Sequence, residues 1–255
     1  MNPYESPKLL AEYLLLHYGS AADVLDGLPG PEEAIDFPSR LVRELLDPAS
    51  LPANACALDL GCAVGGSSFE LARTCGEVLG IDFSHSFIQA ANLLRESGRH
   101  SFEKTIEGEI TEPAAAEVPP EIDRARVTFE QGDAMDLDAN PKSKIKNRKS
   151  FDVVLAANLV CRLPDPARLI DQLPALVRTG GQLLLTTPFT WLEEYTPRAN
   201  WIGGTREGGR SFDALRRALA PDFEFEYRTE LPFLIREHAR KFQYGVALGT
   251  RWRRK

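Results

Sequence analysis

The 255-residue sequence predicts an α/β fold in which a mostly parallel sheet carries helices on both faces. Residues 57–60 form a buried apolar strand, residues 61–66 form a tight turn of small residues, and a helix begins at Ser67. A second apolar strand, at 77–82, ends in an acid, and the fourth strand spans 151–158. Apolar runs separated by helical segments are typical of parallel strands that are buried on both faces.

The turn after the first strand indicates a nucleotide-like ligand, because glycines let backbone N–H groups approach closely and a helix N-terminus favours negative charge. A dinucleotide-binding turn reads Gly-x-Gly-x-x-Gly. Here Asp59 precedes Gly61, Ala63 and Gly65 at alternate positions. This pattern resembles motif I of the class I S-adenosylmethionine-dependent methyltransferases, which implies that the acid and the turn hold the amino-acid part of the cofactor. A turn that binds nothing is the alternative.

Ala63 departs from the middle glycine of that motif. We expect the change to be mild, because alanine adds one methyl group and loses only the region of positive φ.

Further polar residues follow the next strands. Asp82, about twenty residues after the turn, suits the two hydroxyls of an adenosine ribose, and Phe83 suits its adenine. Asp133 and Ala134 follow another apolar segment and suit the adenine amino group. The strand that ends at Asn158 lies beside the first strand in such sheets, so we expect Asn158 to contact the cofactor and face the reacting methyl group.

Composition narrows the classes of function. A net charge of −7 and an isoelectric point near 5.3 argue against general nucleic-acid binding. The four cysteines lack Cys-x-x-Cys spacing and neighbouring histidines, so we expect reduced thiols and no metal site or disulfide. No apolar run reaches the roughly 18 residues that cross a membrane, and no signal peptide is visible, which favours the cytoplasm.

Residues 1–50 are expected to form a helical cap over the cofactor, with helices at 7–18 and 37–46. Arg40 or Arg43 suits the cofactor carboxylate, because guanidinium groups bind carboxylates through two hydrogen bonds. Solvent-exposed helix arginines are an equal alternative. Residues 2–6 form either a frayed tail or a segment folded over the active site.

The rest of the chain fits one domain spanning 1–255. Residues 101–149 form a variable insertion with a hairpin at 104–111, and its basic segment at 142–149 favours a solvated loop over a nucleic-acid contact. A helix at 167–177, capped by Gly180 and Gly181, precedes a strand at 182–187. After a helix at 212–220, strands at 223–235 and 241–253 form an antiparallel hairpin around a polar turn at 236–240.

Residues 188–205 follow the fifth strand of the sheet and form the expected substrate loop. Its aromatic side chains suit a flat substrate and its carboxylates suit an ammonium group. Arg236, near the sheet end, suits a substrate carboxylate. The alternative for each tryptophan taken singly is a place at the edge of the core. The expected substrate-binding residues are Tyr4, Tyr13, Trp191, Glu194, Trp201 and Arg236.

Several blocks together resemble the methyltransferase module of ovothiol biosynthesis, and LAANLVCRL and TWLEEYTP are much more specific than motif I. The other blocks are NPYES, CALDLGCAVGGSSFELAR, GIDFSHSFIQAA and LPFLIREHARKFQY. The resemblance implies a Rossmann-like class I methyltransferase with a seven-stranded sheet and an antiparallel C-terminal hairpin. It also implies N-methylation of the imidazole ring of 5-thiohistidine (4-mercaptohistidine) to ovothiol A, in a stand-alone form that pairs with a separate sulfoxide synthase.

Under this hypothesis S-adenosylmethionine is the cofactor, S-adenosylhomocysteine is its product, and no metal takes part. Asn158 and a tyrosine (Tyr195, or Tyr4 or Tyr13) orient the ring through hydrogen bonds. Three alternatives stay open: methylation of another small amino-acid-like metabolite, a non-catalytic cofactor-binding partner of the synthase, and a protein or nucleic-acid methyltransferase. The acidic isoelectric point disfavours nucleic acid.

Overall fold

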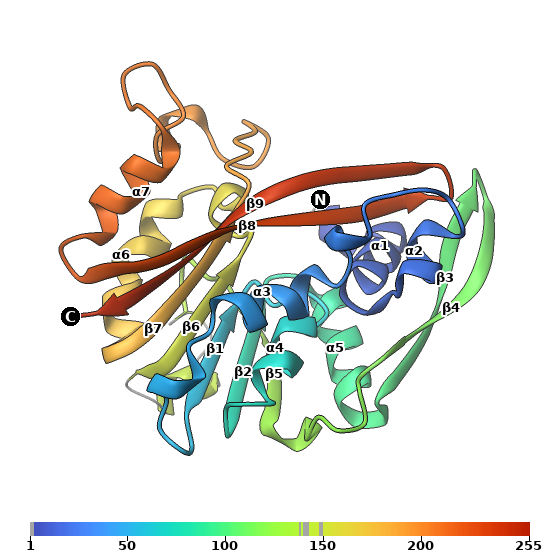
Figure 1. The fold of residues 1–255 in the computed structure, drawn as a ribbon, viewed down its shortest axis with the longest axis horizontal. Coiled ribbons are helices and arrows are strands. Elements are labelled where there is room, and N and C mark those ends of the chain that lie inside the picture. The colour runs from blue at the N-terminus through green and yellow to red at the C-terminus, as the bar shows by residue number, and fades with distance from the viewer. Residues whose placement is uncertain (1–2, 138, 140–142, 148–149) are drawn as a thin grey trace.

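The computed structural model describes residues 3–137, 139, 143–147 and 150–255. A seven-stranded sheet has the order β5-β2-β1-β6-β7-β9-β8 (Figure 1). The strands from β5 to β7 in this order run parallel, and β9 pairs antiparallel with β7 and with β8. The predicted fold class is therefore confirmed. The strands are β1 Cys56–Leu60, β2 Glu77–Asp82, β5 Val127–Gln131, β6 Phe151–Ala157, β7 Val177–Thr187, β8 Phe223–His238 and β9 Lys241–Arg254.

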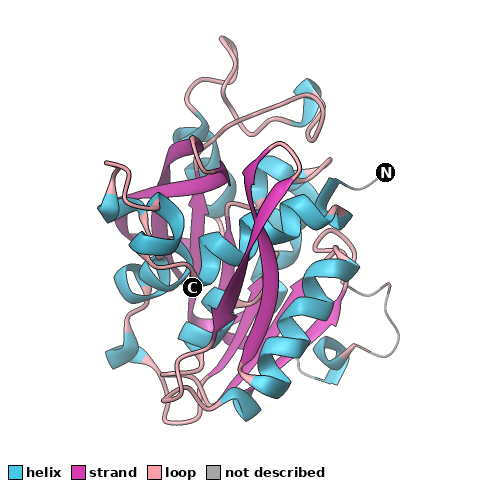
Figure 2. Cartoon of the chain, turned by 90° about the vertical axis from the view of Figure 1, so that its right-hand side faces the viewer, coloured by secondary structure: helices cyan, strands magenta, loops and turns pink. Residues whose placement is uncertain are grey.

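Helices cover both faces of this sheet (Figure 2). One face packs against α3 (Phe37–Leu45), α4 (Gly66–Leu71) and α5 (His85–Ser97), and the other against α6 (Pro166–Leu176) and α7 (Ser211–Leu219). Successive residues of β1 point to opposite faces, so that Ala57 belongs to the first cluster and Leu58 to the second. Burial on both faces is the reason why the central strands are continuous apolar runs in the sequence.

The N-terminal residues form α1 (Pro7–Tyr18), where a helix was predicted, and the short helix α2 (Ala21–Leu25), which was not predicted. Helix α1 begins where Ser6 accepts a hydrogen bond from the Leu9 N–H and Pro7 occupies the first turn. The helix packs against β8 and against β3 (Arg99–Glu107). It therefore lies under the part of the β8–β9 hairpin that extends beyond the sheet (Figure 1).

Strand β3 pairs antiparallel with β4 (Ile110–Glu117), which confirms the predicted hairpin and makes it longer at both ends. The turn residue Gly108 has a φ of 56°. The predicted basic loop at 142–149 lies partly outside the described residues. Within the described part of the chain, each helix is too short or too polar to cross a lipid bilayer.

Two local predictions are wrong. Helix α6 ends at Leu176, and Gly180 and Gly181 lie within β7 rather than at a helix cap. Strand β7 starts early because Val177 already pairs with Phe151, and Gly180 takes a φ of 77° where the register then shifts. Similarly, β8 continues to His238, so the expected turn at 236–240 shortens to residues 239–240.

Candidate active site

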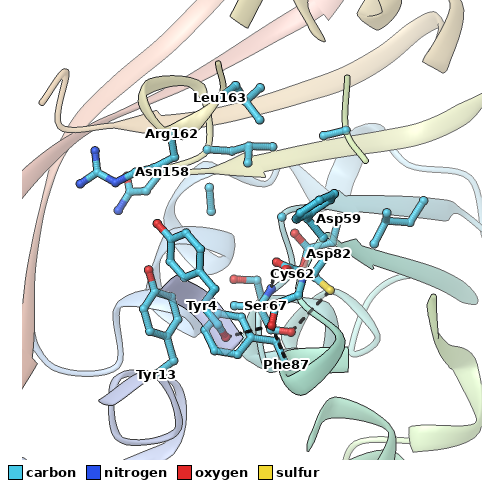
Figure 3. A pocket seen from close by; sticks show the side chains of 18 of the residues that line it. Tyr4, Tyr13, Asp59, Cys62, Ser67, Asp82, Phe87, Asn158, Arg162 and Leu163 are labelled. Atoms are coloured by element: carbon cyan, nitrogen blue, oxygen red, sulfur yellow. Dashed lines mark hydrogen bonds between the residues drawn. The ribbon is translucent and has the colours of Figure 1, made fainter. Parts of the chain in front are cut away.

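A cavity of about 380 Å³ lies at the carboxyl ends of β1, β2, β5 and β6 (Figure 3). Residues of the N-terminal segment, α1, the start of α3, β8 and the loop after β7 line its other walls. Parallel strands place their carboxyl ends at one edge of the sheet, which is where α/β proteins bind ligands. The cavity is therefore the candidate active site.

The turn between β1 and α4 needs unusual backbone angles. Gly61 and Gly65 have φ values of 73° and 90°, and a Cβ atom at Gly65 would lie 2.5 Å from Cζ of Phe129. Ala63 also adopts a positive φ, of 47°, so the expectation that alanine avoids this region is wrong. Its N–H donates to Oδ2 of Asp82 at 2.9 Å, which holds the turn against the end of β2.

Two buried acids stand at this end of the sheet. The side chain of Asp59 is 1% exposed, and its Oδ2 accepts a hydrogen bond of 2.6 Å from Oγ of Ser68. Its Oδ1 is buried and has no hydrogen-bond partner among the described residues. Burial raises the pKa of Asp59 to about 7 and that of Asp82 to about 6. An ammonium or hydroxyl group of a ligand would supply the partner that Asp59 lacks.

Asn158 lies at the end of β6 with its backbone in the left-handed region, at a φ of 50°. Its N–H donates to the Thr186 carbonyl at 2.8 Å, and its Oδ1 accepts a hydrogen bond of 2.9 Å from Oγ1 of Thr186. Because these contacts fix the amide, Nδ2 is the side-chain atom that stays available to a ligand in the cavity. No described residue accepts a hydrogen bond from it.

Three tyrosines surround this end of the cavity. Tyr4 and Tyr13 pack edge to face with ring centroids 6.0 Å apart, and Tyr4 and Tyr195 lie 6.5 Å apart. Burial raises the pKa of Tyr4 to about 12 and that of Tyr13 well above its usual value. Both phenols therefore keep their protons at neutral pH and can donate hydrogen bonds.

Residues 3–6 of the N-terminal segment are folded over the cavity rather than frayed, and Asn2 lies outside the described residues. Oγ of Ser84 donates to the Tyr4 carbonyl at 3.0 Å. The carboxylate of Glu5 accepts hydrogen bonds of 2.8 and 3.1 Å from the N–H groups of His85 and Ser86 at the start of α5. These contacts explain how a terminal tyrosine comes to line the site.

Residues 32–238 match the family model described as a methyltransferase domain. The chain belongs to this family. It is 28% identical over 158 residues to a ubiquinone biosynthesis O-methyltransferase of Xanthomonas axonopodis pv. citri. That match covers 62% of this chain and 53% of the relative, so the chain spans about half the relative's length. Residues 32–238 therefore form a methyltransferase domain.

Solved structures share the fold at low identity. A SAM-dependent methyltransferase of Methanosarcina mazei has a TM-score of 0.53 and 20% identity, over 82% of this chain and 98% of that one. The [4+2]-cyclase SpnF has a TM-score of 0.55 and 18% identity, over 98% and 97% of the two chains. A cyclase on the same fold means that the likeness of structure alone does not specify the reaction.

Most of the predicted cofactor residues of the methyltransferase line the cavity. Phe83 is 61% exposed and lies at the rim, while Oδ1 of Asp133 accepts a hydrogen bond from the Met135 N–H at 2.8 Å. Gly65 is an exception, since it supports the turn from behind without lining the cavity. The cavity-lining members of the predicted set are Asp59, Gly61, Ala63, Asp82, Phe83, Asp133, Ala134 and Asn158.

The two arginines expected near the cofactor carboxylate have other partners. Arg40 does not line the cavity, and its guanidinium donates to the Pro232 carbonyl and lies 3.4 Å from Glu44. Arg43 pairs with Asp36 and, at 3.5 Å, with Glu70. Helix α3 turns these arginine side chains toward β8 and α4, and the assignment of Arg40 to the cofactor stays a prediction.

The residues predicted to bind the substrate lie in different places. Trp191 and Trp201 stack on each other at 6.2 Å, and their indole N–H groups donate to Ser211 and Thr196, outside the cavity. Arg236 is 2% exposed and donates to the Asp23 carbonyl at 2.8 Å, so it caps α2 rather than meeting the cavity. Tyr195 and Glu194 of the same loop do line it.

The sequence analysis did not assign His17 or Arg162 to the site, although both line the cavity. His17 of α1 is buried, and its Nδ1 accepts a hydrogen bond of 3.0 Å from the Gly66 N–H, so its proton resides on Nε2. Burial lowers the pKa of His17 to about 3. Arg162 follows β6 in the short 3-10 helix Val160–Arg162. Only its place four residues after Asn158, within LAANLVCRL, signalled a role.

Proposed function

We propose that this methyltransferase transfers a methyl group to an imidazole nitrogen of 5-thiohistidine and so produces ovothiol A. The observation that carries the proposal is the set of groups around the end of β6, where Asn158, Tyr4, Tyr13 and Tyr195 surround one cavity. Phenol rings and an amide suit a small flat ring with polar edges. The specific blocks LAANLVCRL and TWLEEYTP support the same substrate through their resemblance to the ovothiol module.

In this proposal the acid-lined half of the cavity holds S-adenosylmethionine. Oδ1 of Asp59 accepts from its ammonium group, and Asp82 accepts from the ribose hydroxyls. Phe83, Asp133 and Ala134 surround the adenine, while Gly61 and Ala63 let the turn approach the amino-acid part. When bound, the cofactor supplies an electrophilic methyl group on a positively charged sulfur.

The remaining residues orient the acceptor. The Nδ2 amide of Asn158 and the phenol of Tyr195 fix the ring plane, and Tyr4 and Tyr13 pack around it. Because the pKa of Tyr4 is raised to about 12 by burial, this phenol serves as a hydrogen-bond donor and not as a base. The proton that the second ring nitrogen loses passes to water at the exposed rim, where Glu194 is placed to hold the substrate ammonium group.

Two other functions compete with this one. The match to an O-methyltransferase favours methylation of a hydroxyl group on another small metabolite. A cofactor-binding protein that assists a sulfoxide synthase without catalysis is the other. Under the ovothiol hypothesis we propose the cytoplasm, because the four cysteines are free thiols, and a separate sulfoxide synthase as the source of the substrate.

The test is a turnover assay with S-adenosylmethionine and either 5-thiohistidine or histidine, followed by mass spectrometry and by NMR assignment of the methyl group. We expect N-methylated 5-thiohistidine and little product from histidine. Asn158→Ala is the slower comparison. Asp152→Asn is the matched control, because Asp152 lies at the other end of the sheet and accepts a hydrogen bond from the Cys56 N–H. Methylation on sulfur, or cofactor binding without turnover of either compound, would sink the proposal.

A further inference from the structure

Arg162 is the one arginine or lysine among the described residues that line the cavity. The other charged side chains there are acids, and three of them lie at the carboxyl ends of β1, β2 and β5. Arg162 instead follows β6 and lies beside Asn158 (Figure 3). A single cation at this place favours a ligand that carries a negative charge next to Asn158.

Hydrogen bonds from one nitrogen of the Arg162 guanidinium hold the group in position. Nη1 donates to the carbonyl oxygens of Cys161 and Thr190, both at 3.1 Å. The guanidinium carbon also lies 4.9 Å from the ring centroid of Tyr195, which is a cation–π contact. These contacts order the side chain and leave Nε and Nη2 without an acceptor among the described residues. A group of this kind is preorganised for a planar, two-oxygen ligand.

No described carboxylate lies within 4.0 Å of this guanidinium, whereas many arginines of the chain are paired. Arg43 pairs with Asp36, and Arg253 pairs with Glu226 at 2.8 Å. Charged side chains that are partly buried are normally paired with an opposite charge. The unpaired state of Arg162, inside a cavity lined by acids, points to an anionic group on the ligand.

The surroundings of Arg162 place that anion at the substrate end. The phenol oxygens of Tyr4 and Tyr13 point toward Arg162 and Asn158 (Figure 3). Burial raises the pKa of both phenols, and the charge of Arg162 partly offsets this rise, which indicates that the guanidinium lies near them. Glu194, on the loop that carries Tyr195, supplies an acid at the same end of the cavity. One cation and one acid at this end match the carboxylate and the ammonium group of an α-amino acid.

We propose that Arg162 binds the α-carboxylate of the methyl acceptor, so that the enzyme selects amino acids over the corresponding decarboxylated amines. The inference rests on the proposed function only in placing the acceptor beside Asn158. It does not depend on the thiol group or on which ring atom is methylated.

The experiment measures binding to the protein saturated with S-adenosylhomocysteine, by calorimetry, for two matched pairs: histidine with histamine, and 5-thiohistidine with 5-thiohistamine. We expect the wild type to prefer the acid in each pair by about 10- to 100-fold, the range for a charge-assisted pair of hydrogen bonds. Arg162→Met should remove this preference, and Arg162→Lys should retain a small part of it because a point charge lacks the planar fork. The affinity for S-adenosylmethionine should change less than about 2-fold, because Asp59 and Asp82 lie on other strands.

Arg198→Met is the matched control, since this arginine of the substrate loop lies 5.9 Å from the Trp201 ring and does not line the cavity. Equal losses for acid and amine in Arg162→Met would overturn the inference, as would a loss confined to S-adenosylmethionine. Equal binding of acid and amine by the wild type, or binding of none of the four compounds, would also overturn it. If the wild type turns over neither substrate but shows the Arg162-dependent preference, the proposed function fails and this inference stands.

Discussion

Replacing Asp59 by asparagine tests whether this carboxyl group binds the cofactor and loses a proton when it does so. Burial raises the pKa of this carboxyl to about 7, so it is about half protonated at neutral pH before a ligand binds. An ammonium group against Oδ1 favours the ionised form. The binding of S-adenosylmethionine is therefore expected to release a proton from Asp59.

The magnitude follows from linkage. One pH unit below the pKa costs about 1.4 kcal/mol of binding free energy, so the affinity at pH 6 should be about 10-fold weaker than at pH 8. Asp82, with a pKa raised by burial to about 6, adds a second step at lower pH. Asp59→Asn should remove the step that belongs to Asp59. Only the step of Asp82 then remains, so the affinity should become constant above about pH 6 and not above about pH 7. It also removes a charge-assisted hydrogen bond, which should raise Kd at pH 8 by about 10- to 100-fold.

The assay is isothermal titration calorimetry of S-adenosylmethionine between pH 5 and 8.5, in pairs of buffers with different ionisation enthalpies. Asp59 of the wild type should release about half a proton at pH 7, and at pH 8.5 the α-amino group of the ligand, with a pKa of about 7.7–8.0, should instead take up a proton on binding. S-adenosylhomocysteine keeps the ammonium group, so it should show the same step. The control Asp152→Asn removes a buried carboxyl that pairs with Arg178 at the far end of the sheet, and it should leave the profile unchanged.

A wild-type affinity that is constant between pH 6 and 8.5 would refute this reasoning. A wild-type profile retained by Asp59→Asn would refute it as well, because the titrating group would then lie elsewhere.

Three other predictions concern single side chains. Asn158→Ala should lower kcat by about 10- to 1000-fold with little change in cofactor affinity. Asn158→Gly should be as slow, although glycine readily adopts the φ of 50° found at this position. An unchanged kcat in these variants would show that the amide takes no part in the mechanism. His17→Phe leaves the Gly66 N–H without an acceptor and should lower the free energy of unfolding by about 1–3 kcal/mol in urea titrations. Since the folded pKa of His17 is about 3 and the unfolded value 6.5, the wild type should lose stability as pH falls from 6.5 toward 3, and the variant should lose less. Trp201→Phe should lower stability by about 1 kcal/mol and leave the substrate KM within about 2-fold, because Trp201 bonds to the Thr196 carbonyl outside the cavity; a tenfold higher KM at unchanged stability would return it to the substrate wall.

The fold could be predicted because its strongest determinants are local. The central strands are apolar on both faces, and polar residues such as Asp59, Asp82 and Asn158 mark their carboxyl ends. The sheet then brings these ends together by its own geometry, so the acid cluster follows from the strand assignments alone. The early start of β7 could not be predicted in this way, because it depends on the pairing of Val177 with Phe151.

The arginines show what local sequence does not encode. Arg40, Arg162 and Arg236 have similar chemistry, yet one bonds to β8, one lines the cavity and one caps α2. Their roles depend on which way α3, the segment after β6 and β8 face in the assembled fold. The positions of Trp191 and Trp201 also depend on the assembled fold, because their indole N–H groups donate hydrogen bonds to Ser211 and Thr196.

The order of strands gives the cavity an electrical polarity. Because β5, β2 and β1 are neighbours in the sheet and β6 follows them, Asp133, Asp82 and Asp59 lie on one side and Arg162 on the other. The acidic side disfavours a pyrophosphate and favours a ligand with positive charge, which is the physical difference between this site and a dinucleotide site. A cationic methyl donor and an acceptor with a carboxylate would thus be drawn to opposite ends of one cavity. The reacting atoms of donor and acceptor would then meet between the two ends, beside Asn158. For this reason we expect the Asp59 variant to weaken the binding of the methyl donor and the Arg162 variant to weaken the binding of the acceptor.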